Sequence, residues 1–371
     1  IGIIQVLFLP GLILQSLIEY PKNILIKMAT IIASSLILNY IIVFALTTIG
    51  IFEQWICFVI ISIEVIFLIT TNWQMLSKTS LENTFVHWWN SLCRSIEDIF
   101  TPITKEETQR WQKFFTLLFL VLFLVSAFSA IDWVSGYFKY NLGRGFETWD
   151  AVVSWNRWGV DWSENHFPQS TQDYPQLIPA AFGMIYQVMG SNEVQFFAKA
   201  IMPFFPLLTM LLMLGMGLKT KNYGYFIGVI IFRYLLKKFF LEYIIAGYVD
   251  LALAFFSLIT ILFLWQMHQE SDHSKKMRLY IQAAFLASGA AITKQAGLYV
   301  LGITAILGFI SYQGSIHPKQ WQYNWKKFAI LLLIPLIIVL PWYGYKLVGF
   351  STTQETSHLL EPIGDTQEVH D

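Results

Sequence analysis

The sequence predicts an all-α polytopic membrane protein with about ten transmembrane helices and a large outer loop between the fourth and fifth of them. Composition is the first observation. Of the 371 residues 56% are hydrophobic and 13% are charged, whereas about a quarter of a soluble globular chain is charged. The second is a mean hydropathy of +0.54. The third is spacing, because apolar stretches of about 20 residues, enough to cross a bilayer, recur between polar segments.

The same composition excludes several classes of function. The 24 basic and 24 acidic residues cancel, which argues against a basic surface for nucleic acid. Cys57 and Cys93 form neither a disulfide framework nor a metal-ligand pattern. The seven histidines are scattered, and there is no Walker motif, glycine-rich nucleotide loop or GxSxG elbow. We therefore expect no metal, no cofactor and no nucleic-acid partner.

Residues 1–113 form a predicted N-terminal unit of spans followed by a cytoplasmic interfacial segment. Its spans are the apolar stretches 2–20, 24–50 and 52–71. The stretch 72–113 mixes charged and aromatic side chains. That mixture is typical of helices that lie on a membrane surface rather than cross it.

Residues 114–350 form the second predicted unit, a membrane domain that holds the remaining spans. These spans are 114–131, 195–218, 223–240, 241–266, 279–293, 297–312 and 328–348. The apolar stretch 175–190 is too short to cross, so we expect a helix in the outer interface or one that dips into the membrane. Residues 351–371 form a polar tail. Because the chain begins without Met and stops in this tail, we expect a piece of a longer protein.

Basic residues orient the spans, because Lys and Arg gather in cytoplasmic loops. If every candidate span crosses the membrane once, most basic residues fall on one side, which is then the cytoplasmic side. Residues 132–174 and the turn at Lys294 then lie on the outer side of the membrane. Arg233, Lys237 and Lys238 disagree with this orientation. The sequence has no Asn-x-Ser/Thr sequon, which fits a bacterial protein of the inner or plasma membrane.

The segment 132–174 is the polar interruption around which we expect the spans to be organised. It holds five of the 14 Trp residues. Glu147 and Asp150 are three residues apart, so on a helical turn they share one face, where one acts as a general base and the other orients it. Trp149 and its neighbours can stack on a sugar or exclude water. An aromatic belt at the interface explains the same tryptophans without any chemistry.

Two further charged residues interrupt apolar stretches. An unpaired Asp250 carboxylate in a span would cost several kcal/mol, so we expect it to pair or to accept hydrogen bonds, in a functional or a structural role. Lys294 can bind a phosphate as a point charge, or it can extend to the interface as lysines near helix ends commonly do. Arg144 and Arg157 are alternative phosphate ligands, since a guanidinium donates in a bidentate manner.

Four short motifs follow one another between the spans. They are Glu147-Thr148-Trp149-Asp150-Ala151, Asp173-Tyr174-Pro175-Gln176-Leu177, Gly247-Tyr248-Val249-Asp250-Leu251 and Thr293-Lys294-Gln295-Ala296-Gly297. In this order they resemble the GT-C class of integral-membrane glycosyltransferases, of the protein mannosyltransferase and lipid A aminoarabinose transferase type. The resemblance covers residues 114–350. It rests on the order and spacing of the motifs, because each motif alone is weakly specific.

The resemblance implies that a hexosyl or pentosyl group moves from a polyprenyl-phosphate donor to an acceptor hydroxyl on the outer face. The acceptor, whether lipid, glycan or protein, stays open. Asp150 takes the position of the catalytic base, and Glu147 is the alternative because many relatives have two adjacent acids there. The predicted substrate-binding residues are Arg144, Trp149, Arg157, Asp173, Tyr174, Asp250, Lys294 and Gln295. A monophosphate donor of this kind needs no metal.

Two other interpretations remain open. A transporter or flippase would use the intramembrane acids Glu64 and Asp250 as coupling sites, although no inverted repeat is visible. A scaffold with the same fold and no activity is the other. The chain also departs from the family in having about three extra spans before the loop. Convergence of Asp150 and Lys294 on one cavity would favour the enzyme, and a polar path through the midplane would favour the transporter.

Overall fold

The structure, a computed structural model, describes residues 1–18, 21, 23–71, 110–141, 143–169, 171, 174–240, 247–313 and 333–348. Its regular elements within these ranges are all helices. The predicted interfacial segment lies outside them except for residues 110–113, and the polar tail lies wholly outside them. The boundary between the two predicted units falls in this gap, so that division stays a prediction.

The first predicted span is two helices rather than one. α1 (Gly2–Leu7) and α2 (Leu9–Leu17) are separated at Phe8, whose φ of −132° leaves the helical region. Pro10 lies in the first turn of α2, where its missing N–H removes no helical hydrogen bond. The expectation of a single helix over 2–20 was wrong at this break.

The next two spans agree with the sequence to within a few residues. α3 (Ile24–Thr48) and α4 (Gln54–Thr71) are both long and apolar. Asn23 caps α3, since its side-chain oxygen accepts from the backbone N of Leu25 at 3.1 Å and of Ile26 at 3.3 Å. α3 is mostly buried and packs against α9, α11 and α15, so it lies at the centre of the protein.

α7 (Arg110–Asn141) is longer than predicted and has 32 residues. The expected polar loop therefore does not begin at Asp132, because the helix continues for three more turns. The Asp132 carboxylate is 2.6 Å from Nη2 of Arg233 on α12 (Tyr223–Leu235). This ion pair gives the acid that follows the apolar stretch of α7 a partner on a neighbouring helix. It also gives a partner to Arg233, one of the three basic residues that disagreed with the orientation of the spans.

The segment after α7 folds into short helices. These are the π-helix η1 (Ala151–Asn156), α8 (Arg157–Ser163), α9 (Leu177–Met189) and α10 (Phe196–Lys199). α9 has 13 residues, too few to cross a bilayer, and it is almost wholly buried against α8 and α3. α8 and α9 can approach closely because Gly183 has no side chain. A Cβ at Gly183 would lie 2.6 Å from Cβ of Trp162.

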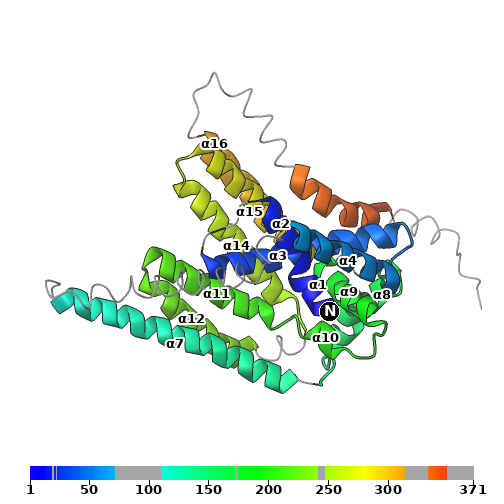
Figure 1. Cartoon of the computed structure of the whole chain (residues 1–371), viewed down its shortest axis with the longest axis horizontal. Coiled ribbons are helices and arrows are strands. Elements are labelled where there is room, and N and C mark those ends of the chain that lie inside the picture. The colour runs from blue at the N-terminus through cyan, green and yellow to red at the C-terminus, as the bar shows by residue number, and fades with distance from the viewer. Residues whose placement is uncertain are drawn as a thin grey trace, which may run out of the picture.

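The remaining elements follow the predicted order with shifted ends. They are α11 (Phe204–Thr220), α12 with its π-helical extension η2 (Leu236–Phe240), α14 (Asp250–Gln269), α15 (His273–Thr293), α16 (Gly297–Gln313) and a helix over Leu333–Val348. α14 begins at Asp250, not at residue 241. Figure 1 shows α14, α15 and α16 on one side of α3, α8 to α10 on another, and α7 along an edge beside α12.

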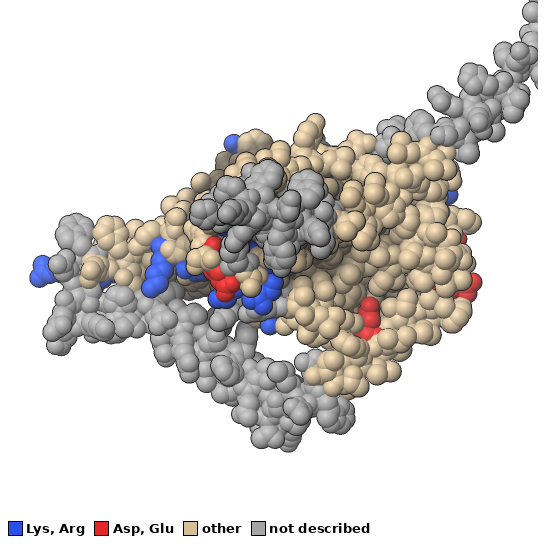
Figure 2. All heavy atoms as spheres, turned by 90° about the horizontal axis from the view of Figure 1, so that it is seen from above, with Lys and Arg blue, Asp and Glu red and all other residues tan. Residues whose placement is uncertain are grey.

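Within the described ranges, five helical stretches are long and apolar enough to cross a membrane. They are Ile24–Thr48, Gln54–Thr71, Gln112–Tyr137, Phe196–Thr220 and Asp250–Gln269. On the face seen in Figure 2, charged side chains gather on one half of the molecule, and most of the remaining surface is uncharged. The described part of the chain is thus an all-helical protein with several membrane-compatible helices. The count of about ten spans and the layout of the loops stay predictions.

Candidate active site

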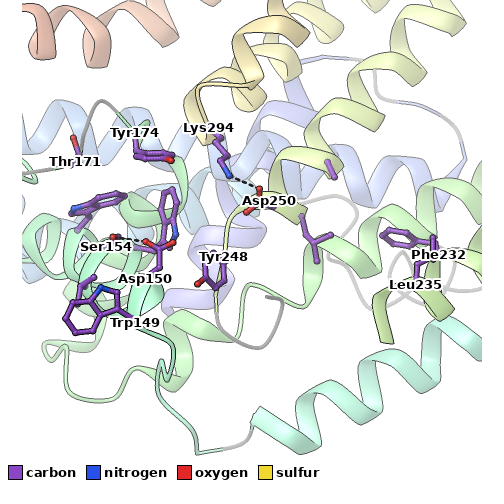
Figure 3. A pocket seen from close by; sticks show the side chains of 15 residues that line it. Trp149, Asp150, Ser154, Thr171, Tyr174, Phe232, Leu235, Tyr248, Asp250 and Lys294 are labelled. Atoms are coloured by element: carbon purple, nitrogen blue, oxygen red, sulfur yellow. Dashed lines mark hydrogen bonds and ion pairs between the residues drawn. The ribbon is translucent and has the colours of Figure 1, made fainter. Parts of the chain in front are cut away.

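A cavity of about 890 Å³ opens between the segment after α7, the helices α12 and α14, and the turn after α15. This size is typical of small-molecule sites. Sequence-predicted site residues that line it are Trp149, Asp150, Tyr174, Asp250 and Lys294. Figure 3 shows their side chains around one opening. Asp150 and Lys294 therefore share a cavity, which is the arrangement that the enzyme hypothesis requires, while their roles stay predictions.

Asp150 lies at the start of the π-helix η1, at the cavity wall. Oγ of Ser154, four residues on, donates a hydrogen bond of 3.0 Å to Oδ1 of Asp150. Among the described residues the Asp150 carboxylate has no second hydrogen-bond partner, so its other oxygen can accept a hydrogen bond from a ligand. Short π-helical turns occur often at functional sites, because the extra residue per turn changes where the side chains point.

The wall beside Asp150 is aromatic. Trp155 and Trp158 are buried, and their rings meet edge to face with centroids 5.0 Å apart. The ring of Tyr174 stacks on Trp158 at 6.1 Å with an interplanar angle of 28°. Trp149 lies at the rim and is 82% exposed. Fixed aromatic faces next to a carboxylate are suited to a sugar ring, which presents C–H groups on its faces and hydroxyls at its edge.

Asp250 and Lys294 form an ion pair in the cavity. Nζ of Lys294 lies 2.7 Å from Oδ1 of Asp250 (Figure 3). Asp250 is the first residue of α14 and Lys294 is the C-cap of α15. The two helix dipoles therefore favour the carboxylate and the ammonium where they lie. The expectation that Asp250 would be paired is confirmed.

Gly247 holds the Asp250 turn against the segment that leads to Asp150. Its φ of +99° is in the region that favours glycine, and a Cβ there would lie 2.6 Å from Cε1 of Phe146. Phe146 also packs on Phe182 of α9, with ring centroids 5.2 Å apart. One buried aromatic side chain thus joins the two turns that carry the cavity's carboxylates.

Four predicted site residues are not among those that line the cavity. Glu147 and Gln295 are exposed. The Arg144 guanidinium lies over the ring of Tyr140 at 4.3 Å. Arg157 is 62% exposed and pairs with Asp161 at 3.0 Å. A fifth predicted residue, Asp173, lies outside the described residues.

Asp161, the partner of Arg157, lies on α8. Burial raises the pKa of its carboxyl, and the neighbouring Arg157 guanidinium opposes that shift. Arg157 is thus engaged in a pair along its own helix. Arg157 was predicted as a phosphate ligand from its residue type alone. The sequence does not show which way its side chain points from α8.

Lys199 of α10 is a residue that the sequence reasoning missed. It is 1% exposed, and its Nζ donates a hydrogen bond of 2.6 Å to the carbonyl oxygen of Gly145. One turn earlier, Oε1 of Gln195 accepts from the backbone N of Phe146 at 3.0 Å. Two side chains of one short element thus hold two consecutive residues of the segment that leads to Asp150. The available signal was a lone lysine in an apolar stretch, the same signal that singled out Lys294.

No three His, Cys, Asp or Glu residues lie close enough to hold a metal ion within the described ranges. The charged groups that line the cavity are two carboxylates and one ammonium, a set suited to proton transfer and to binding an anion. Comparison with protein-family models, with curated proteins and with solved structures finds no match for this chain.

Proposed function

We propose that this protein is a membrane glycosyltransferase that moves a sugar from a polyprenyl-phosphate donor to an acceptor hydroxyl, with Asp150 as general base. One observation carries the proposal. The carboxylate of Asp150 and the ammonium of Lys294 line the same cavity, beside the ring faces of Trp158 and Tyr174. Transfer from a phosphate donor needs a base, a cation and a surface for the sugar, and these side chains supply all three.

The proposed reaction is a single displacement. The acceptor oxygen attacks the anomeric carbon and its proton passes to the free carboxylate oxygen of Asp150. The bond between that carbon and the phosphate oxygen breaks, and the electron pair leaves with the phosphate. The phosphate then gains negative charge, and Lys294 stabilises it. Asp250 holds Lys294 at the cavity wall before the donor enters.

The lipid part of the donor has an apolar route to the cavity. Phe232 and Leu235 of α12 and Leu251 and Ala254 of α14 line it opposite the polar groups. A polyprenyl chain can lie against these side chains while its phosphate reaches Lys294. Such a donor explains why this chemistry would be held among membrane helices.

The proposal includes the finer features that the sequence predicts. These are a GT-C-like arrangement of about ten spans, a cavity on the outer membrane face, and a location in a bacterial inner membrane. The order of the four sequence motifs supports the first, the distribution of basic residues supports the second, and the lack of an Asn-x-Ser/Thr sequon fits the third. In a transporter or flippase, Asp250 would exchange ions together with Glu64. The pairing of Asp250 with Lys294, beside Asp150, favours the enzyme.

Donor turnover tests the proposal. The whole chain is placed in lipid nanodiscs with a panel of radiolabelled polyprenyl-phosphate hexoses and pentoses, and the label that reaches acceptor or water is measured. Asp150→Asn keeps the shape of the side chain and removes the base, so we expect turnover to fall by about 10²- to 10⁴-fold. Glu193→Gln, at an exposed carboxylate outside the cavity, is the control.

The outcomes separate the hypotheses. Loss in Glu147→Gln with normal turnover in Asp150→Asn would assign the base to Glu147. Absence of turnover with every donor, combined with movement of labelled lipid across the bilayer, would replace the enzyme with a flippase.

A further inference from the structure

A second, smaller cavity lies between α11, α12 and α14. It is a groove of about 200 Å³ with apolar and aromatic walls. Met216 comes from α11, Tyr225 from α12, and Leu258, Ile261 and Trp265 from α14. Ile261 is exposed, so the groove opens on the outside of the helix bundle, where the hydrocarbon of a bilayer would meet it.

A lysine lies near the groove, at the end where α11 and α14 both finish. Lys219 follows Met216 by three residues, nearly one turn, and its Nζ donates a hydrogen bond of 3.2 Å to Oε1 of Gln266. An ammonium has three donors, and this bond uses one of them. Lys219 is exposed, so the other donors of its ammonium can reach an anion beside the groove.

The acids that follow α14 are held by backbone groups rather than by Lys219. Oε1 of Glu270 accepts from the backbone N of Ser271 and Asp272, both at 3.0 Å. The Asp272 side chain caps α15, and the two backbone N–H groups that it accepts from lower the pKa of its carboxyl. Because both carboxylates have these partners, they compete little for the Lys219 ammonium.

We propose that this groove binds an acyl chain of an anionic membrane phospholipid and that Lys219 binds the lipid phosphate. The apolar walls match the chain, and the ammonium beside the groove matches the headgroup. Basic pockets between membrane helices bind anionic headgroups in this way. The lipid lies across α11 and α14 and stabilises their packing.

The lipid site is separate from the candidate active site. Asp250 and Gln266 are sixteen residues apart on α14, a rise of about 24 Å along the helix. A variant at Lys219 therefore leaves the active-site side chains in place. The proposal does not depend on sugar transfer.

Native mass spectrometry of the whole chain tests the site. The protein is titrated with phosphatidylglycerol, which is anionic, and with phosphatidylcholine, which has no net charge. We expect one phosphatidylglycerol to be retained preferentially, and Lys219→Met to weaken its retention about fivefold, the effect of one lysine near a lipid phosphate. Ile261→Trp places a larger side chain over the groove and should reduce retention of the acyl chain.

Lys275→Met is the matched control, because it removes the same charge from an exposed lysine at the start of α15. Equal weakening in Lys219→Met and Lys275→Met would show a general effect of charge and overturn the site. Equal retention of the two lipids by the unmodified protein would overturn it as well, as would full retention in Ile261→Trp.

Discussion

Glu147 and Asp150 are close in sequence and lie in different surroundings. The idea that they share one helical face was wrong, because residues 144–147 are not helical and regular structure begins only at Trp149. Glu147 is exposed and does not line the cavity. Asp150 lines the cavity and is oriented by Ser154. Of these two acids Asp150 is the one that lines the cavity, which is why the proposed function assigns the base to it.

Lys199 provides a test of how the base is positioned. Lys199→Met should lower kcat for donor turnover by about 100-fold with little change in KM. Loss of the Lys199 hydrogen bond would let the Gly145 segment shift, and a displacement of Asp150 by about 1 Å is enough for such a loss. Lys199→Arg, which can still donate to the Gly145 carbonyl, should recover part of the loss. Steady-state kinetics on the donor panel measures both.

Lys27→Met is the control for this prediction, since it removes a lysine from another membrane-compatible helix. Thermal unfolding of each variant checks that folding is intact. A fall in kcat of the same size in Lys27→Met, or a rise in KM alone for Lys199→Met, would contradict the positioning role.

Individual helices illustrate what hydropathy does not reveal. α9 is apolar because protein surrounds it, not because it crosses a membrane. α7 continues as a helix beyond Asp132, which pairs with Arg233 of α12. Burial and pairing with a neighbouring helix therefore override the local pattern that placed the loop boundary at Asp132.

The start of α3 carries an element-level prediction. Asn23 accepts from two backbone N–H groups of α3, and its Nδ2 donates to the carbonyl oxygen of Gly215 on α11 at 3.2 Å. Asn23→Ala loses both the cap and the link, and should lower the free energy of unfolding by about 1–3 kcal/mol. Asn23→Asp keeps the cap and loses the donor, so it should be intermediate. Equal stability of all three proteins in thermal unfolding would contradict this.

The whole molecule has a core that joins the two units predicted from the sequence. Leu36, Ile37 and Tyr40 of α3 are buried in the same cluster as residues of α9, α11 and α15. Within a membrane such contacts act through van der Waals packing and hydrogen bonds rather than through exclusion of water. The N-terminal helices thus support the elements that carry the cavity.

A shortened chain tests this dependence. A protein that begins at residue 110 should fail to give a monodisperse peak in size-exclusion chromatography, because α9, α11 and α15 lose the helix against which they pack. Co-expression of residues 1–109 as a separate chain should restore the peak. A well-behaved chain without the first 109 residues would show instead that the second unit folds independently.

The helical class and the approximate positions of α3 and α4 could be read from the sequence. Asp150, Asp250 and Lys294, which line the cavity, could be singled out there as isolated charges. Hydropathy and the isolation of a charge are local properties, and a bilayer imposes helix on any long apolar segment. The break at Phe8, the length of α7 and the start of α14 at Asp250 could not be located in that way. Mean hydropathy does not register Pro10, which follows the break at Phe8. The Asp132–Arg233 and Asp250–Lys294 pairs join residues that are far apart in the chain.

The composition of the cavity was decided by tertiary packing. Lys294 meets Asp250 across 44 residues, and Lys199 meets Gly145 across 54. The same packing left Arg144, Arg157 and Gln295 outside the cavity. Residue type and spacing identify groups capable of chemistry. Their convergence depends on how helices pack, because contacts between distant segments leave no periodic signal in the sequence.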